Sequence, residues 1–204
     1  MDKNIEKEIR EEWFKDHKAV YAEQGNFKLL IWSEPGTCEH AVRYVFDGNK
    51  IYITGDIGEA IFQAKEEITL EKIAKLTIDQ FHKRIVTIEE KWSFDSDKAI
   101  KHLENDIEEI EDQLNNYAEQ EEFLKEHEEW TSYLGTFTNL MNESKECPCR
   151  EHWVQKILVD YWDDINEYDQ DCHEWIFDIG NDYPRNVQEF LIGLKMSYEQ
   201  LKEK

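Results

Sequence analysis

The chain has 204 residues, of which 47 are acidic and 24 are basic, so its formal net charge is −23. A surface with this charge repels nucleic acid and anionic membranes and attracts basic partners, although an acidic surface also serves plain solubility. Aromatic residues make up 13% of the sequence, which supplies a buried core and argues against a disordered chain.

Targeting features are missing from the sequence. Residues 1–12 are mostly charged, unlike a secretory signal, and no apolar run approaches the ~20 residues that a membrane helix needs. The four cysteines do not follow the spacing of a secreted disulfide framework. We therefore expect a cytoplasmic protein that binds neither membranes nor nucleic acid directly.

The first part of the chain predicts a helix followed by a small antiparallel sheet. Apolar residues at helical spacing predict an amphipathic helix over residues 4–22, ended by Gly25. The turn signal Asp47-Gly48-Asn49 predicts a hairpin. Four segments rich in β-branched and aromatic residues are the predicted strands: 27–32, 41–46, 50–54 and 60–64.

Two short helices should follow the sheet. Thr69 is a suitable N-cap for the first, and Thr77 with Gln80 fits a capping box for the second. Residues 86–92 fit either a strand or an extended linker. Before these helices, Asp56 lies between two glycines, where a carboxylate usually accepts hydrogen bonds from backbone amides.

The second part of the chain predicts helices. Asp95 or Ser96 should cap a long helix, and after Tyr117 the residues Phe123, Leu124 and Trp130 suggest either a second helix or a kinked continuation. We expect a loop in the second half of 135–148, a helix over 151–168 and a last helix from Pro184. The apolar seam of the long helix follows alternating steps of three and four residues: Ile100, Leu103, Ile107, Ile110 and Leu114.

These elements predict an α+β fold, with a small antiparallel sheet near the N-terminus packed by helices and a long acidic helical region after it. The corresponding boundaries are residues 1–94 and 95–204, and we expect the two parts to pack together as one unit.

An acidic run at 104–129 is the first candidate for a binding surface. As one helix it would be about 39 Å long, with carboxylates spaced roughly as the phosphates of one DNA strand. The run could therefore act as a DNA mimic toward a basic protein, or it could be an ordinary solvated helix face. The residues that we assign to partner binding are Glu104, Glu108, Glu109, Glu111, Asp112, Glu121 and Glu122.

A second acidic patch lies at 160–174. Its acids alternate with Tyr161, Trp162, Tyr168 and Trp175, a mixture that suits a protein–protein interface or, equally, a helix whose aromatic residues face inward. The candidate binding residues are Asp163, Asp164, Glu167, Asp169 and Asp171.

Cysteine and histidine residues suggest a structural zinc site, because Zn²⁺ takes four sulfur or nitrogen ligands in a tetrahedron. The candidate ligands are Cys147, Cys149, His152 and Cys172, and Cys38, His40 or His173 could replace one of them. The alternative is a set of four reduced thiols, some of them buried as small apolar groups.

Sequence signatures of enzymes are scarce. The chain contains no G-x-S-x-G, P-loop or H-E-x-x-H motif, so we predict a protein that is not an enzyme. A small metal-dependent hydrolase built on Asp56 and the cysteine and histidine cluster is the catalytic alternative.

Three stretches, GDIGEAIF at 55–62, KWSFDSDKAIKHL at 91–103 and GLKMSYEQL at 193–201, resemble small proteins encoded by phages and prophages. Proteins of that kind include anti-CRISPR inhibitors. The resemblance implies a phage-encoded inhibitor in the bacterial cytoplasm that binds a nucleic-acid-handling protein, such as the Cas nuclease Cas9, and blocks its engagement of DNA. It brings no catalytic residues. A phage structural or assembly protein that self-associates through its helical seam is the other alternative.

Overall fold

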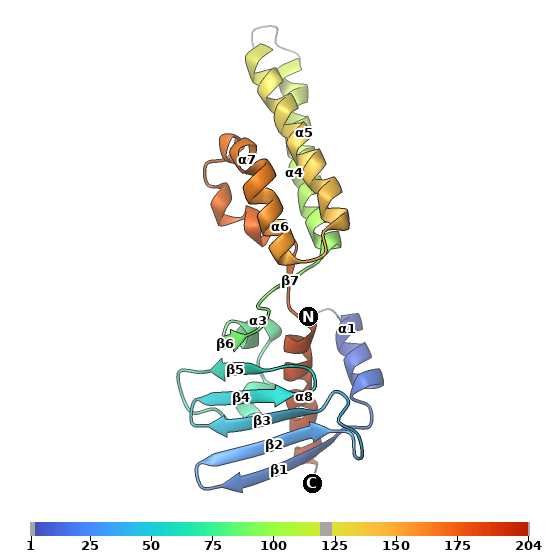
Figure 1. Cartoon of the computed structure of the whole chain (residues 1–204), viewed down its shortest axis with the longest axis vertical. Coiled ribbons are helices and arrows are strands. Elements are labelled where there is room, and N and C mark those ends of the chain that lie inside the picture. The colour runs from blue at the N-terminus through green and yellow to red at the C-terminus, as the bar shows by residue number, and fades with distance from the viewer. Residues whose placement is uncertain (1–2, 119–123, 204) are drawn as a thin grey trace. The chain divides into compact units, whose positions relative to one another are not determined.

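The computed structural model describes residues 3–118 and 124–203, which fold into two compact units (Figure 1). Residues 1–91 and 183–204 form what we call the sheet unit, and residues 92–182 form the helical unit. The predicted α+β class is confirmed, because a six-stranded antiparallel sheet near the N-terminus is followed by helices. The last helix, however, belongs to the sheet unit, whereas we expected it in the acidic helical region.

The sheet is a meander in which each strand pairs with the next one along the chain. The predicted hairpin is confirmed, with Asp47 opposite Lys50 across the turn. The segment that the sequence left open, 86–92, begins in the sixth strand. The strands are β1 (Lys18–Gln24), β2 (Phe27–Ser33), β3 (Val42–Asp47), β4 (Lys50–Gly55), β5 (Ala60–Gln63) and β6 (Ile85–Ile88).

The prediction of one helix over residues 4–22 is wrong in its second half. Helix α1 (Lys3–Glu8) continues into a π-helical turn, η1 (Ile9–Trp13), and the chain then enters β1. A turn at Gly25 and Asn26 folds β1 back onto β2, and the two strands pair along their whole length. The apolar residues of this segment fit the spacing of a helix as well as that of a strand. The strand forms because pairing with β2 satisfies the backbone N–H and C=O groups.

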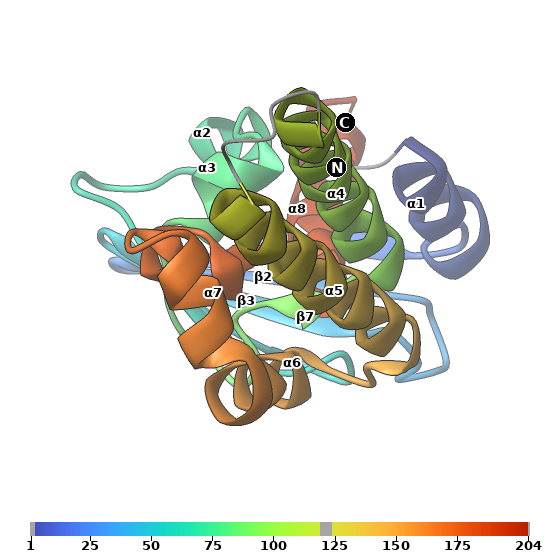
Figure 2. The ribbon, with the colours of Figure 1, turned by 90° about the horizontal axis from the view of Figure 1, so that it is seen from above.

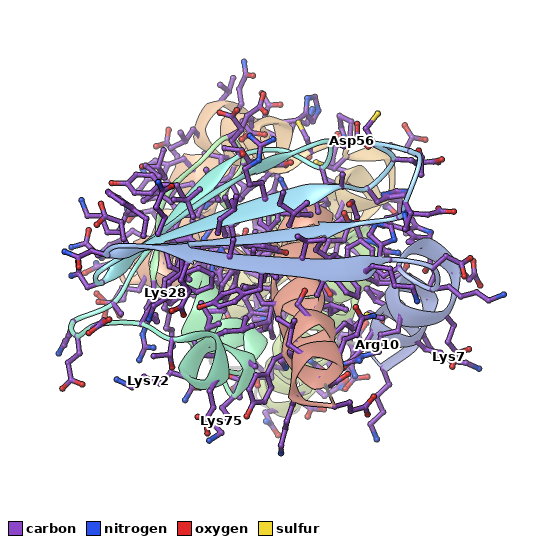
Figure 3. The ribbon with its side chains drawn as sticks, turned by 90° about the horizontal axis from the view of Figure 1, so that it is seen from below. Lys7, Arg10, Lys28, Asp56, Lys72 and Lys75 are labelled. Carbon is purple, nitrogen blue, oxygen red and sulfur yellow. The ribbon has the colours of Figure 1, made fainter. Side chains whose placement is uncertain are left out.

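Helices cover one face of the sheet (Figures 2 and 3). Helix α8 (Arg185–Lys202) crosses this face, with α1 on one side and α2 (Leu70–Ala74) and α3 (Ile78–His82) on the other. Strand side chains alternate accordingly, so that Val42, Tyr44 and Phe46 are buried while Arg43 is exposed. The apolar partners from α8 are Val187, Phe190, Leu191, Ile192 and Leu194.

The predicted helix starts are confirmed. The hydroxyl of Thr69 accepts a hydrogen bond from the backbone N–H of Lys72, 3.3 Å away. The capping box of α3 is complete: the Gln80 N–H donates to Thr77 Oγ1 and the Thr77 N–H donates to Gln80 Oε1.

Helix α8 approaches the sheet most closely at Gly193. The Tyr44 hydroxyl donates a 3.0 Å hydrogen bond to the carbonyl oxygen of Phe190, one turn earlier on the helix. A Cβ at position 193 would lie 2.6 Å from Tyr44 Oη and 3.1 Å from Trp32 Cδ1. Both side chains are fully buried and lack room to move aside, so this helix position requires glycine.

We predict that Gly193→Ala destabilises the protein by about 1–3 kcal/mol, because overpacking outweighs the gain in helix propensity. The matched control is Gly135→Ala in the helical unit, where a Cβ would meet nothing within 4 Å. That change should stabilise its helix by about 0.5–1 kcal/mol. Urea unfolding of both variants measures the difference, and a stabilised Gly193→Ala protein would contradict the close packing.

A carboxylate on α8 is buried. Glu189 is 3% exposed, and its carboxylate lies 3.5 Å from the guanidinium of Arg185. The same guanidinium pairs with Glu8 at 2.8 Å and lies over the ring of Trp13. Burial raises the pKa of Glu189 to about 7, against the opposing effect of Arg185.

This shift predicts a pH dependence of stability. Between pH 4.5 and about 7 the folded state keeps a proton on Glu189 that the unfolded chain releases, so stability falls as the pH rises through this window. The contribution amounts to up to about 3 kcal/mol. We predict that Glu189→Gln removes this part of the dependence. Unfolding free energies at pH 5 and pH 8 test it against the exposed control Glu203→Gln; equal slopes for all three proteins would refute the shift.

The helical unit is built on a hairpin of two long helices, α4 (Ser96–Ala118) and α5 (Leu124–Glu146). Asp95 caps α4 by accepting a 3.0 Å hydrogen bond from the Lys98 N–H. The predicted seam of α4 is buried at Leu103 and Ile110. The expected loop before Pro148 is absent: α5 continues to Glu146, because Leu140 packs into the same core.

The remaining elements pack against this hairpin. The predicted helix over 151–168 is confirmed, interrupted by a π-helical turn. Strands β7 (Ser93–Phe94) and β8 (Asn181–Asp182) pair with each other, so the two ends of the unit lie side by side. Within the described residues, every helix is too short or too polar to cross a membrane. The other elements are α6 (Arg150–Lys156), η2 (Ile157–Tyr161), α7 (Trp162–Tyr168), η3 (Cys172–Glu174) and η4 (Ile176–Asp178).

Candidate functional site

The negative charge of the protein is concentrated in the helical unit. Residues 92–182 contain 26 of the 47 acidic residues but six of the 24 basic ones, which gives this unit a net charge of −20. The sheet unit, with 21 acidic and 18 basic residues, carries −3. The acidity therefore belongs to one folded unit and is not a uniform property of the surface.

Four carboxylates form a continuous face on α4. Glu104, Glu108, Glu111 and Asp112 are separated by four, three and one residues, which places them on one side of the helix. All four are exposed, and none has an ion-pair partner among residues 3–118 and 124–203. We call these four residues the α4 acidic face.

The acidic run is not a single 39 Å helix, which corrects our expectation for residues 104–129. It belongs to α4 and α5, whose apolar seams pack against each other, because a lone helix would leave Leu103 and Ile110 in water. Glu121 and Glu122 lie outside the described residues. The α4 acidic face thus retains the carboxylate spacing over a shorter length than the sequence indicated.

Glu109 lies on the other flank of α4, near a half-buried carboxylate. Asp106 is 3.7 Å from the imidazole of His102, and burial raises the pKa of Asp106 above its usual value. Both carboxylates also raise the pKa of the Tyr168 phenol, after the larger effect of its burial. In the sequence Asp106 is only one acid of the run, and His102 four residues earlier is the signal for this pair.

The second acidic patch is partly exposed and partly structural. Asp163, Asp164 and Glu167 are exposed on α7, and Asp164 also accepts a 3.3 Å hydrogen bond from the hydroxyl of Thr136. The neighbouring aromatic residues are half-buried against the core of the helical unit. They hold α7 in place, which agrees with the alternative in which the aromatic residues of this segment face inward.

Asp169 stabilises the turn after α7. Its carboxylate accepts hydrogen bonds from the indole N–H of Trp175 at 2.7 Å and from the backbone N–H of Asp171 at 2.9 Å. The Asp171 side chain is exposed. Of these two candidate binding residues, Asp171 is therefore the one whose carboxylate is available to a partner.

We predict that Asp169→Ala destabilises the protein by about 1–3 kcal/mol, since it leaves the Trp175 and Asp171 N–H groups without their acceptor. Asp171→Ala is the matched control and should change stability by less than about 0.5 kcal/mol. Chemical denaturation followed by tryptophan fluorescence compares the two, and equal effects would show that the Asp169 contacts contribute little.

The candidate zinc ligands occupy different environments within the helical unit. Cys147 donates a hydrogen bond to the carbonyl oxygen of Cys149, His152 is exposed on α6, and Cys172 is fully buried. Burial raises the pKa of Cys147 and of Cys172, which disfavours the thiolate that binds zinc. In the described parts of the chain no three His, Cys, Asp or Glu residues are grouped as metal ligands. Structural zinc stays a prediction without support from this geometry.

Asp56 has the structural role that its position predicts. Its carboxylate accepts a 2.9 Å hydrogen bond from the backbone N–H of His40, and the flanking Gly55 and Gly58 both have positive φ. His40 also has positive φ and stacks on the ring of Trp13. Both Asp56 and the alternative ligands Cys38 and His40 belong to the sheet unit, whereas the other cysteines belong to the helical unit.

No protein-family model matches the chain, and neither curated proteins nor solved structures provide a match. The resemblance of the three sequence stretches to phage-encoded proteins stays a prediction. Charge, exposure and contacts are therefore what indicates the function of this protein.

Proposed function

We propose that this protein is a non-catalytic inhibitor that binds a basic, nucleic-acid-handling protein through its helical unit and competes with DNA. The observation that carries the proposal is the concentration of charge, −20 in one unit, with four exposed carboxylates on the α4 acidic face that have no ion-pair partner among the described residues. The sequence resemblance names a Cas nuclease such as Cas9 as the first partner to test.

The spacing of the carboxylates supports a role as a DNA mimic. From Glu104 to Asp112 the helix rises about 12 Å, at ~1.5 Å per residue. On average the four charges give one carboxylate per about 3–4 Å of helix axis, comparable with the one phosphate per ~3.4 Å of axis that each strand of DNA carries. A basic groove that binds phosphates could accept this rigid row of carboxylates without rearranging its lysine and arginine side chains.

The electrostatics suit competition with DNA. The strong negative field of the helical unit steers a basic partner at long range and speeds association. Because such attraction is screened over about 8 Å at physiological ionic strength, binding should weaken steeply as salt is added.

Two observations weigh against the alternatives. The α4 seam proposed for self-association is buried within its own hairpin, so assembly through it would first have to open the unit. The Asp56 carboxylate proposed for a hydrolase already accepts the His40 N–H.

We predict that neutralising the α4 acidic face, with Glu104→Gln, Glu108→Gln, Glu111→Gln and Asp112→Asn together, weakens partner binding at least tenfold. Each side chain is exposed, so the fold should persist. Binding to purified Cas9, and to basic DNA-binding proteins captured from a bacterial lysate, is measured by biolayer interferometry at 50 and 300 mM NaCl.

The matched control removes four exposed acids from the sheet unit, with Glu12→Gln, Glu59→Gln, Glu89→Gln and Glu90→Gln. It changes the net charge equally and should alter affinity less than threefold. Equal losses for both variants would show that total charge matters and not this face. Salt-independent binding would refute the electrostatic mechanism altogether.

A further inference from the structure

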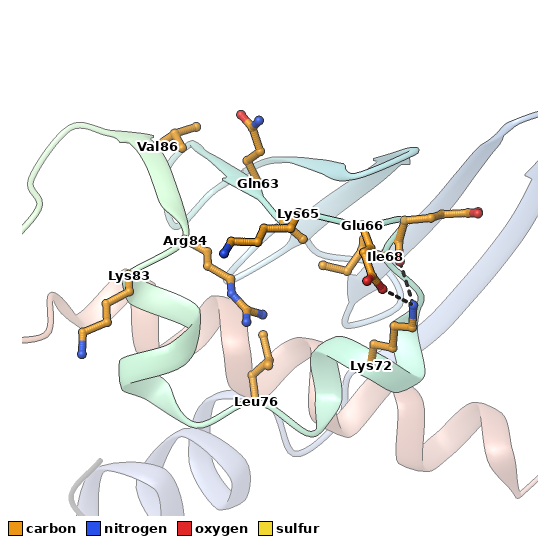
Figure 4. A pocket seen from close by; sticks show the side chains of 11 residues that line it. Gln63, Lys65, Glu66, Ile68, Lys72, Leu76, Lys83, Arg84 and Val86 are labelled. Carbon is orange, nitrogen blue, oxygen red and sulfur yellow. Dashed lines mark hydrogen bonds and ion pairs between the residues drawn. The ribbon is translucent and has the colours of Figure 1, made fainter.

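The sheet unit contains a pocket that the acidic surfaces do not explain. It has a volume of about 670 Å³ and lies between the end of β5, helix α2 and the turn from α3 into β6 (Figure 4). Pockets of about 300–1,000 Å³ are typical of small-molecule sites. Its lining combines apolar side chains with a cluster of cations.

Most of the charges around this pocket neutralise one another. Lys72 lies 4.0 Å from Glu66 and also donates to the backbone carbonyl oxygen of Glu67. The remaining two pairs are Lys83 with Asp79 at 3.1 Å and Lys28 with Glu67 at 3.8 Å. Each of these cations has an internal counter-charge.

Lys65 and Arg84 are the two pocket cations that these ion pairs do not include. Neither has an ion-pair partner in the described part of the chain, and both side chains extend over the pocket in Figure 4. Together they leave the pocket with an excess of two positive charges. In a protein with a net charge of −23, whose long-range field repels anions, a local excess of this kind is what an anion site requires.

The apolar part of the lining indicates the body of the ligand. Ile68 is buried and Leu76 is half-buried, whereas Val86 on β6 is 57% exposed. A ligand that covered Val86 and Leu76 would remove apolar surface from water. The pocket is thus suited to a molecule with an apolar portion and an anionic group.

We propose that this pocket binds a small phosphate monoester with an aromatic or aliphatic body, such as a nucleoside monophosphate. A phosphate monoester carries a charge of about −1.5 to −2 at pH 7, which matches the two unpaired cations, whereas a carboxylate supplies one charge. The Arg84 guanidinium presents the planar donor fork that suits phosphate oxygens, and Lys65 adds a mobile ammonium group. The volume matches one small molecule.

Isothermal titration calorimetry of the full chain tests the ligand class. Adenosine 5′-monophosphate should bind at least tenfold more tightly than adenosine, which lacks the charge, and than inorganic phosphate, which lacks the apolar body. Hexyl phosphate distinguishes the two kinds of body: binding like the nucleotide indicates an aliphatic-tolerant site, and weaker binding indicates that the base is recognised. Equal affinity for adenosine and its monophosphate would overturn the proposal, as would preferential binding of an oligonucleotide.

Variants locate the site. The double change Lys65→Gln with Arg84→Gln should weaken the nucleotide at least tenfold, and Val86→Asp should do the same by placing a negative charge on the apolar wall. Lys75→Gln is the matched control, because Lys75 is an exposed lysine at the C-terminal end of α2 that pairs with Glu71 and is not among the residues that line the pocket (Figure 3). The affinity of this control for the nucleotide should stay within twofold of that of the unchanged protein. If the control loses as much affinity as the double variant, the loss comes from the change in overall charge and the pocket is not the site. Circular dichroism confirms that each variant is folded.

Discussion

The packing of α8 against the sheet is the constraint on which the rest of the structure depends. A six-stranded antiparallel meander has one apolar face, and the helix that covers it lies at the other end of the chain. Phe190, Leu191 and Leu194 are fully buried in this layer, and each such side chain contributes about 1.5–3 kcal/mol by leaving water. The close approach at Gly193 and the hydrogen bond from Tyr44 fix the helix on the sheet.

The position of α8 in the chain explains why the helical unit is an insertion. Because α8 belongs to the sheet unit, residues 92–182 are inserted between two segments of that unit, and the β7–β8 pair holds the two ends of the insertion together. The helical unit has its own core around Trp153, Phe137 and Leu103, and most of the acidic residues described in this unit are exposed. Charge can therefore accumulate on its surface with self-repulsion as the main cost.

The two units consequently present different chemistry. The helical unit offers a row of exposed carboxylates that suits a cationic protein. The sheet unit, almost balanced in charge, offers a pocket with two cations that lack an ion-pair partner in the described part of the chain. The buried Glu189 lies beside Arg185 on the same helix, and its pKa is raised because the loss of water outweighs the opposing effect of the guanidinium.

The sequence by itself determined the elements whose signals are local. Turn residues such as Gly48, the capping pair Thr77 and Gln80, and the three- and four-residue steps of α4 each act within a few positions, so the hairpin, α3 and the long helix were predicted correctly. Tertiary structure decided what depends on distant partners. Lys18–Gln24 became a strand because β2 pairs with it, and Asp169 became a turn acceptor because Trp175 reaches it. Lys65 and Arg84 line the same pocket because the end of β5 pairs with the turn from α3 into β6. Spacing along a chain specifies which face a side chain occupies, whereas the groups that finally surround it are set by the packing of segments that the sequence keeps far apart.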